Sequence, residues 1–301
     1  MKLTSGELSG RSYRGALHVH TTCSDGKLSP AQSCRRYRRL GFDFVFITDH
    51  DQWNDHSHLS DAEFKVFSAL ELSCRGGREH VVALGVHAWA GRQDTQEAID
   101  WVNGLGGVPV LCHPFWSRMA LRRALELEGY PLLEVWNTHG GLKYARESSH
   151  FWDLLLAEGR RIYAVAADDS HAARDCGGGF VEVWAEELSE EAILKALRAG
   201  RFYSSCGPKI ETLKWTPEGI WVRTEGPIRG VALMGDGGFF DHKVIKPGSD
   251  GSGVEHEQLI PRQIRTYGRV EMEDRFHKRA WLQPVWPSSA KRAAEAHRPV
   301  S

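Results

Sequence analysis

Two histidines one residue apart, His18 and His20, end an apolar segment near the start of the chain. Side chains alternate between the two faces of a β-strand, so a His-x-His pair points both imidazoles to the same side. Asp169 and His171 repeat this spacing further along the chain. Imidazole and carboxylate groups together are typical ligands of Zn, Mn and Fe. The spacing therefore favours a metal-binding role for both pairs.

Further residues of the same types lie close to other apolar segments. Asp49 and His50 follow one segment, Glu71 and His113 lie at the ends of two others, and His80 opens one. In α/β folds, the carboxyl ends of parallel strands meet at one edge, so we expect these residues to converge on a multinuclear metal site. A lone strand histidine is more often an ordinary core residue. Because so many candidates lie at the ends of predicted strands, a purely structural role for all of them is less favoured than metal binding. Asp49 could instead orient a ligand histidine.

Strands and helices that would position these residues alternate along the first two thirds of the chain. Short apolar, β-rich segments predict strands at 16–20, 43–48, 65–72, 80–86, 108–112, 132–136, 162–167 and 180–184. Helical spacing predicts helices at 30–40, 94–103, 117–128, 149–159 and 189–199. The alternation predicts an α/β fold with a largely parallel sheet or barrel.

The pattern changes after Gly207. Residues 209–286 show short alternating segments broken by Gly and Pro, which predicts a small antiparallel β domain, with a mobile loop at 245–262. We therefore divide the chain into a domain at 1–206, a β domain at 207–287 and a tail at 288–301 that we expect to be disordered.

The composition is that of a globular protein whose charges nearly cancel, so it has no strong overall electrostatic field. The chain has 301 residues and a net charge of -1, which favours neither nucleic acid nor a membrane as partner. No apolar segment approaches the ~20 residues that span a bilayer, and no signal-peptide apolar region is present. The six cysteines are scattered without a CxxC pair, which predicts reduced thiols in a cytoplasmic protein. The arginines within 35–39 leave nucleic acid open as a partner, although a solvated helix face is favoured.

The ordered segments LHVHTTCSDG, ITDHD, LELS, EHVVALG, CHP and ADDSH resemble the motifs of the polymerase and histidinol phosphatase (PHP) superfamily of metallohydrolases. EVWN at 134–137 and ALRAGRFYSSCGP at 196–208 are most similar to the branch with CehA/McbA-type hydrolases and small phosphoesterases. The resemblance covers residues 15 to about 205. It implies a distorted (β/α)7 PHP barrel, followed here by the small β domain, with two or three divalent ions, Zn, Mn or Fe, at the carboxyl ends of the strands.

The resemblance also implies which residues bind each ion. His18, His20 and Asp169 would bind the first ion. His80 and His113 would bind the second ion, and Asp25, His50 and His171 would bind the third. Glu71 is the carboxylate that bridges two ions. His80 follows Glu71 closely in sequence, so His87 is the alternative at that position.

A hydroxide that bridges two divalent ions is a nucleophile at neutral pH, so this ligand set predicts a phosphoesterase that acts on a small phosphorylated molecule, with nucleotides among the candidates. Glu71 and Asp169 would act in catalysis as metal ligands, and His139 could protonate the leaving group.

Candidates for substrate binding lie on the neighbouring loops. Arg118 and Arg174 could bind a phosphate, and Asn137 should face the mouth of the site, although a solvated surface role is at least as common for any one arginine. Trp53 could stack on an aromatic ring or simply pack in its loop.

Three alternatives remain at this point. A carbamate, ester or amide hydrolase on the same barrel would need an aromatic, apolar pocket rather than arginines near the metals. A non-catalytic PHP binding module would have lost ligands, whereas every ligand position is filled here. A thiol hydrolase using Cys112 beside His113 is the least favoured, because a ligand histidine cannot also serve as base.

Overall fold

The computed structural model describes residues 6–8, 11–89, 91, 93–139, 146–215, 219–235, 238–244, 254–259 and 266–286. The chain divides into two compact units. The first unit comprises Arg11–Trp152 and Ile162–Cys206, and the second comprises Met1–Gly10, Asp153–Arg161 and Gly207–Ser301. The expected disordered tail lies outside the described residues, and so does most of the expected loop at 245–262.

The strands of the first unit form one continuous order, β10-β9-β2-β3-β4-β5-β6-β7-β8. Their bounds are β2 Ser12–Ala16, β3 Phe44–Ile47, β4 Lys65–Cys74, β5 Glu79–Leu84, β6 Val108–Leu111, β7 Leu132–Asn137, β8 Tyr163–Ala167, β9 Phe180–Trp184 and β10 Phe202–Ser205. The Ser204 hydroxyl on β10 donates to the Ala164 carbonyl on β8 at 2.7 Å, so the two ends of this order come together. The sheet of the first unit thus curves round on itself. A strict (β/α)7 arrangement stays a prediction.

The expectation of a largely parallel sheet is wrong for β5 and β9. β2, β3 and β4 are parallel, as are β6, β7 and β8, but β5 is antiparallel to both β4 and β6. β9 is antiparallel to β2 and β10. The reason at β5 is its connection: the one-turn 3-10 helix η2, Arg75–Gly77, joins it to β4, with Gly76 and Gly77 at positive φ. So short a connection can join only antiparallel neighbours.

The reversal of β5 has a direct effect on the ligand edge. Ser73 near the end of β4 pairs with His80 near the start of β5. The amino end of an antiparallel strand lies beside the carboxyl end of its neighbour. His80 therefore reaches the same edge as the other ligand candidates, although it opens its strand.

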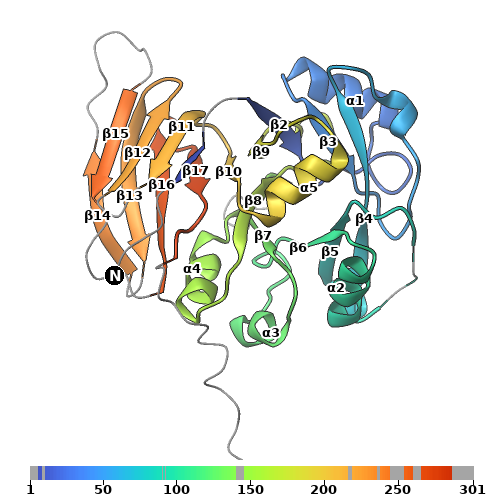
Figure 1. Cartoon of the computed structure of the whole chain (residues 1–301). Helices are drawn as coiled ribbons and strands as arrows, with labels where there is room; N and C mark the ends of the chain where they lie inside the picture. Colours follow the sequence, from blue (N-terminus) through green and yellow to red (C-terminus); the bar gives the residue numbers. More distant parts are fainter. Residues whose placement is uncertain are drawn as a thin grey trace, which may run out of the picture. The chain divides into compact units, whose positions relative to one another are not determined.

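Helices surround these strands at the positions that the sequence predicts, as Figure 1 shows. Their bounds are α1 Pro30–Arg39, α2 Thr95–Gly104, α3 Leu121–Glu126, α4 Ser149–Ala157 and α5 Glu190–Arg198, with a further 3-10 turn η1 Ser57–Leu59. The Ser29 side chain accepts from the Gln32 amide at the start of α1, and Pro30 occupies its first turn. Both features stabilise a helix start.

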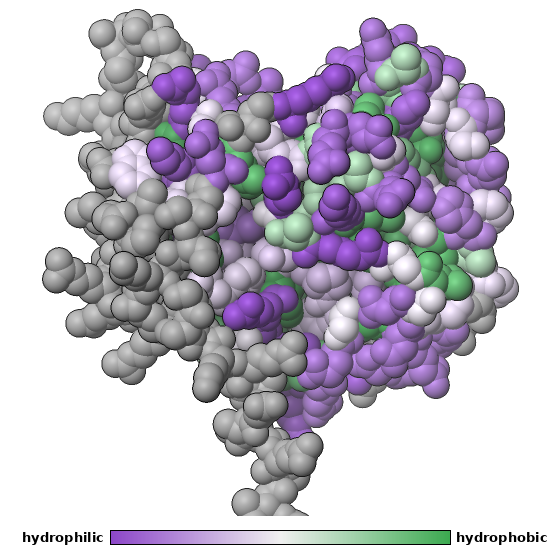
Figure 2. Space-filling model, in the orientation of Figure 1, coloured by the Kyte–Doolittle hydropathy of each residue, from purple (hydrophilic) through white to green (hydrophobic). Residues whose placement is uncertain are grey.

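The core of the first unit follows the two-residue period of its strands. Phe44 and Phe46 on β3, and Val82 and Leu84 on β5, belong to one buried cluster that includes Ile193 and other residues of α5. Alternate positions of the strands thus fill the interior. Figure 2 shows mainly hydrophilic residues, with smaller apolar patches, on the visible face of this unit.

The second unit contains two antiparallel sheets, β1-β11-β12-β15 and β14-β13-β16-β17. Their bounds are β1 Gly6–Leu8, β11 Ile210–Trp215, β12 Gly219–Thr224, β13 Ile228–Gly235, β14 Gly238–Val244, β15 Val254–Leu259, β16 Gly268–Asp274 and β17 Arg279–Leu282. All the strand pairs within these two sheets are antiparallel, and the predicted loop is wrong at β15, which pairs with β12.

The division of the chain also differs from the sequence-based boundary at 206. β1 belongs to the second unit because it pairs with β11, with Leu8 opposite Leu213. Asp153–Arg161 joins the same unit, where Asp153 receives two hydrogen bonds of 2.7 Å from Arg269. Among the described residues, none of the helices has the length and apolar character needed to cross a bilayer.

Candidate metal centre

Glu71, on β4, lies at the centre of the converging side chains and is 1% exposed. Its Oε2 atom lies 3.1 Å from His20 Nε2 and 3.2 Å from His18 Nε2. Its Oε1 atom lies 2.8 Å from His80 Nδ1 and 3.2 Å from His113 Nε2. Each carboxylate oxygen thus faces a different set of histidines, because Oε2 also lies 3.1 Å from His50 Nδ1.

His18 and His20 form a four-residue group with Glu71 and Asp169. His18 and His20 follow β2 in an extended segment, and their Nε2 atoms are 3.0 Å apart, so both rings point the same way. Asp169 Oδ1 lies 3.1 Å from His20 Nε2 and 3.4 Å from His18 Nε2. The parallel bridge between Val19 and Ser170 holds the two segments side by side.

These donor atoms fit a metal ion better than they fit one another. Glu71 Oε2 and His50 Nδ1 are buried and 3.1 Å apart, yet neither makes a hydrogen bond within the described part of the chain. Two ligands of a common ion, each about 2.0–2.2 Å from it, lie roughly 3 Å apart, which is the spacing found throughout this group. Oxygen and imidazole donors of this kind suit Zn, Mn or Fe.

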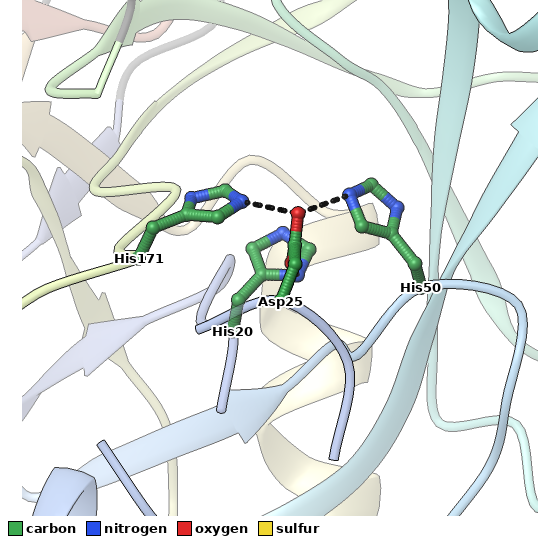
Figure 3. Close-up of side chains that lie close together, drawn as sticks. All are labelled: His20, Asp25, His50 and His171. Carbon is green, nitrogen blue, oxygen red and sulfur yellow. Dashed lines mark ion pairs between the residues drawn. The ribbon is translucent and has the colours of Figure 1, made fainter. Parts of the chain in front are cut away.

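Glu71, His80 and His113 form the second group. The third group, His20, Asp25, His50 and His171, lies at the more exposed edge of the centre, where the Asp25 side chain is 55% exposed. Figure 3 shows its carboxylate between His171 and His50. Asp25 Oδ2 is 3.3 Å from His171 Nε2 and 3.8 Å from His50 Nε2, and Oδ1 is 3.7 Å from His20 Nδ1. Partial burial raises the pKa of Asp25, but His171, His20 and His50 outweigh it and lower the pKa below its ordinary value.

Replacing Asp25 by asparagine should lower the metal content by about one ion per chain, because a neutral amide is a poor ligand for these metals. Activity should fall by at least about 10–100-fold, the range seen when a residue that only orients a metal ligand is lost. Metal analysis of the purified protein measures the first effect, with Asp55→Asn on an exposed loop as the matched control. An unchanged ion count would mean that Asp25 only orients His50 and His171.

Opposite charges shift the pKa values of the buried donors. Burial lowers the pKa of His18, but Glu71 and Asp169 outweigh it and raise the pKa well above its ordinary value. Burial and the same two carboxylates act on His20, whose pKa rises to about 9. Burial raises the pKa of Glu71, while His18 and His80 bring it well below its ordinary value. An ion that binds between His18, His20 and the carboxylates would compete with protons for the same atoms.

Two ligand candidates have an uncommon backbone conformation. His113, just beyond β6, has a φ of 28°, and Asp169, just beyond β8, has a φ of 48°. Only a few per cent of non-glycine residues have positive φ, and such positions cluster at functional sites, where the surrounding structure must hold them. The chain thus bends sharply as it leaves each strand to present these side chains.

Glu134 contacts two of the ligand candidates from the side away from Glu71, and the sequence analysis does not assign it a role. It is buried in β7, where its Oε1 contacts His18 Nδ1 at 2.6 Å and its Oε2 accepts from the His113 amide at 2.9 Å. The Asn137 amide donates to Glu134 and also to Asp169, each at 3.1 Å. An acidic residue inside the apolar segment LLEVWN is the signal that could have revealed it. Asn137, the expected substrate contact, is itself buried behind the ligands.

Asp49 holds the turn that carries Asp25, rather than a ligand histidine. It accepts from the Thr21 amide, the Thr21 hydroxyl and the Ser24 hydroxyl, each at 2.7 Å. These bonds fix the segment between His20 and Asp25.

The remaining candidates lie around the third group. The His139 ring stacks on His171 with centroids 4.2 Å apart, and its Nδ1 lies 3.3 Å from Asp175 Oδ2. Arg174 is exposed, with its Nε 3.6 Å from Asp175 Oδ1. Arg118 is exposed in the turn after β6.

The structure also places the two alternatives that involve His87 and Cys112. His87 is exposed and pairs with Glu190 at 2.9 Å, whereas His80 is the residue beside Glu71. Cys112 is completely buried, and burial raises the pKa of its thiol well above the ordinary value. A protonated, buried thiol is a poor nucleophile, so the geometry does not favour a thiol hydrolase.

Comparison with solved structures identifies the fold of the chain. No family model matches the chain, and no curated protein matches its sequence. A two-domain protein from Bacteroides vulgatus, containing a predicted PHP-like metal-dependent phosphoesterase, is similar over 91% of this chain and 93% of its own, with a TM-score of 0.54 and 16% identity. PsfC from Pseudomonas syringae covers 62% of this chain and 89% of its own (TM-score 0.46, 15% identity). The lesion-specific endonuclease EndoQ from Pyrococcus furiosus covers 63% and 56% (TM-score 0.45, 15% identity). The likeness to the B. vulgatus protein shows that this chain has a PHP-like fold, as its motifs predict.

Proposed function

We propose that the protein is a metal-dependent hydrolase, and specifically a phosphoesterase that acts on a small phosphorylated molecule. The observation that carries the proposal is Glu71, whose two buried oxygens face two separate sets of histidines, which are His18, His20 and His50 on one side and His80 and His113 on the other. A carboxylate in this position fits the bridge between two divalent ions. Two ions so placed would activate water at neutral pH and neutralise charge on a phosphoryl group.

The proposed ligands form three overlapping groups that would hold two or three ions of Zn, Mn or Fe. These groups are His18, His20, Glu71 and Asp169; Glu71, His80 and His113; and His20, Asp25, His50 and His171. We assign phosphoryl transfer because this number of metal-binding groups would place several positive ions around a phosphate. Charge neutralisation is the main requirement of that reaction.

Residues around the ligands have proposed roles of their own. Glu134 and Asn137 keep His18 and Asp169 in position through the hydrogen bonds described above. We assign proton donation to the leaving oxygen to His139, which Asp175 holds by its Nδ1 atom, so that Nε2 is the acidic position. Exposed Arg118 and Arg174 would attract the phosphate.

A second candidate is a carbamate, ester or amide hydrolase on the same fold. The observation that favours it is the pair of exposed aromatic residues, Phe115 and Trp116, on the turn after His113. An aryl ester would use that surface without any need for arginine.

Purified protein should contain two or three ions per chain and should lose all hydrolytic activity when chelated, with recovery on return of the ion. Phosphomonoesters and phosphodiesters should be hydrolysed faster than aryl esters and carbamates. Steady-state kinetics on a matched panel, such as phenyl phosphate, phenyl acetate and a phenyl carbamate, measures the preference. A clear advantage for the carbamate or acetate would replace the phosphoesterase by the second candidate, and full activity without metal would overturn both.

A further inference from the structure

Two large aromatic side chains are exposed on the turn that directly follows His113. Phe115 is 49% exposed and Trp116 is 48% exposed. The Trp116 ring centroid lies 5.0 Å from the His113 ring and 5.9 Å from the His80 ring. Trp116 therefore borders the group formed by Glu71, His80 and His113 and presents the rest of its surface to solvent.

The turn that carries these rings is held firmly. The Ser117 amide donates to the His113 carbonyl at 3.0 Å, and the Arg118 amide donates to the Phe115 carbonyl at 3.1 Å. Ser117 Oγ also lies 3.1 Å from His113 Nδ1, which ties the turn to the ligand ring itself. The backbone that carries the two exposed aromatic side chains is thus held in place.

A single exposed tryptophan needs no explanation, since apolar atoms form much of every protein surface. Trp116 differs because its ring packs against two ligand candidates, so a substrate held at the group formed by Glu71, His80 and His113 would lie beside it. Ligand sites typically combine a few polar groups that fix orientation with aromatic walls that contribute contact area.

We propose that Trp116, with Phe115 beside it, forms an aromatic wall that binds a flat ring in the alcohol part of the substrate. The inference rests on the proposed phosphoesterase function and narrows it to phosphate esters that carry an aromatic ring, either a nucleobase or an aryl group. Both ring types offer a π-face to the indole, and aromatic pairs favour offset or edge contacts.

Binding of phenylphosphonate and methylphosphonate to the metal-loaded protein separates the ring from the charged group. Both carry the same head group, and neither is an ester that the protein could consume. Calorimetry should show that the wild type binds phenylphosphonate about tenfold more tightly, as expected for one aromatic contact. Trp116→Ala should lose this advantage while its affinity for methylphosphonate and its metal content remain unchanged.

Trp89→Ala is the matched control, because Trp89 is exposed to a similar degree, 51%, but follows the carboxyl end of β5, opposite the end that carries His80. This variant should bind both phosphonates as the wild type does. Equal affinity of the wild type for the two phosphonates would overturn the proposal, and so would an equal loss of both in Trp116→Ala.

Turnover of adenosine monophosphate, phenyl phosphate and glycerol phosphate identifies the source of the ring. Trp116→Ala should raise KM for the ring-bearing esters about tenfold with kcat retained, and it should leave glycerol phosphate unaffected. A larger effect on adenosine monophosphate supports a nucleobase, and a larger effect on phenyl phosphate supports an aryl group. If no phosphate ester is hydrolysed while the phosphonate preference persists, the phosphoesterase assignment fails and the aromatic wall stands.

Discussion

Replacing Glu71 by glutamine should remove ions from two groups at once and leave the protein without measurable hydrolysis. Glutamine keeps the shape of the side chain but has one oxygen and no charge. It therefore cannot bind one ion beside His18 and His20 and a second ion beside His80 and His113. Residues that merely orient a metal ligand change affinity about 10–100-fold when mutated, so loss of the central carboxylate should exceed that range. Metal analysis and steady-state kinetics on the same preparation measure both effects.

The control for this variant is Glu182→Gln, on β9. Glu182 is a strand glutamate that accepts from Ser12 at 2.9 Å and from Arg14 at 3.3 Å, near the amino end of β2 and away from the ligand edge. It should retain full metal content and activity. If Glu71→Gln keeps its ions, Glu71 is not a ligand and the proposed function loses its main support.

Removal of the Asp153 carboxylate should destabilise the second unit by about 3 kcal/mol, the lower end of the cost of leaving a buried charge without its partner. The Arg269 side chain is completely buried and donates to both oxygens of Asp153, and the variant would lose this contact while that with Glu271 remains. Burial lowers the pKa of Arg269, but Asp153 and Glu271 outweigh it and raise the pKa, so the guanidinium stays charged. Urea unfolding of Asp153→Ala, followed by tryptophan fluorescence, measures the change.

An exposed ion pair provides the comparison. Arg122 and Glu126 lie one helical turn apart on α3, both largely exposed, so Glu126→Ala should cost well under about 1 kcal/mol. A similarly small cost for Asp153→Ala would mean that the ion pair between Asp153 and Arg269 contributes little to the stability of the second unit.

Much of the first unit could be predicted because its elements carry strong periodic patterns. Each predicted strand from 43–48 to 180–184 overlaps a strand from β3 to β9, and the five predicted helices are α1 to α5. Only the first strand is displaced, since β2 ends at Ala16 and the two histidines follow it in an extended segment. Strand direction was harder, because the pattern of a buried strand is the same in either direction. The pair Gly76-Gly77 was the available signal for a hairpin.

The pairing of distant segments was the other limit. β1 is only Gly6–Leu8, and its place beside β11 depends on a partner about two hundred residues away, which no local pattern encodes. Similarly, an acidic residue inside the apolar segment LLEVWN singles out Glu134, but it does not say which neighbours Glu134 holds, and its role rests on its contacts with His18 and the His113 amide. Residues that support a site are identified by what they touch, not by spacing.

The reversal of β5 also changes how far apart along the chain the members of the centre are. The contact between Glu71 and His80 closes a loop of 9 residues, whereas that between His18 and Glu134 closes one of 116. Because closure entropy grows with the logarithm of loop length, the local contact costs about 2 kcal/mol less to form. One part of the centre is therefore assembled by a single hairpin, and the rest depends on the closure of the whole first unit. Substitutions that loosen this closure should displace His18, His20 and Asp169 before they disturb the hairpin pair.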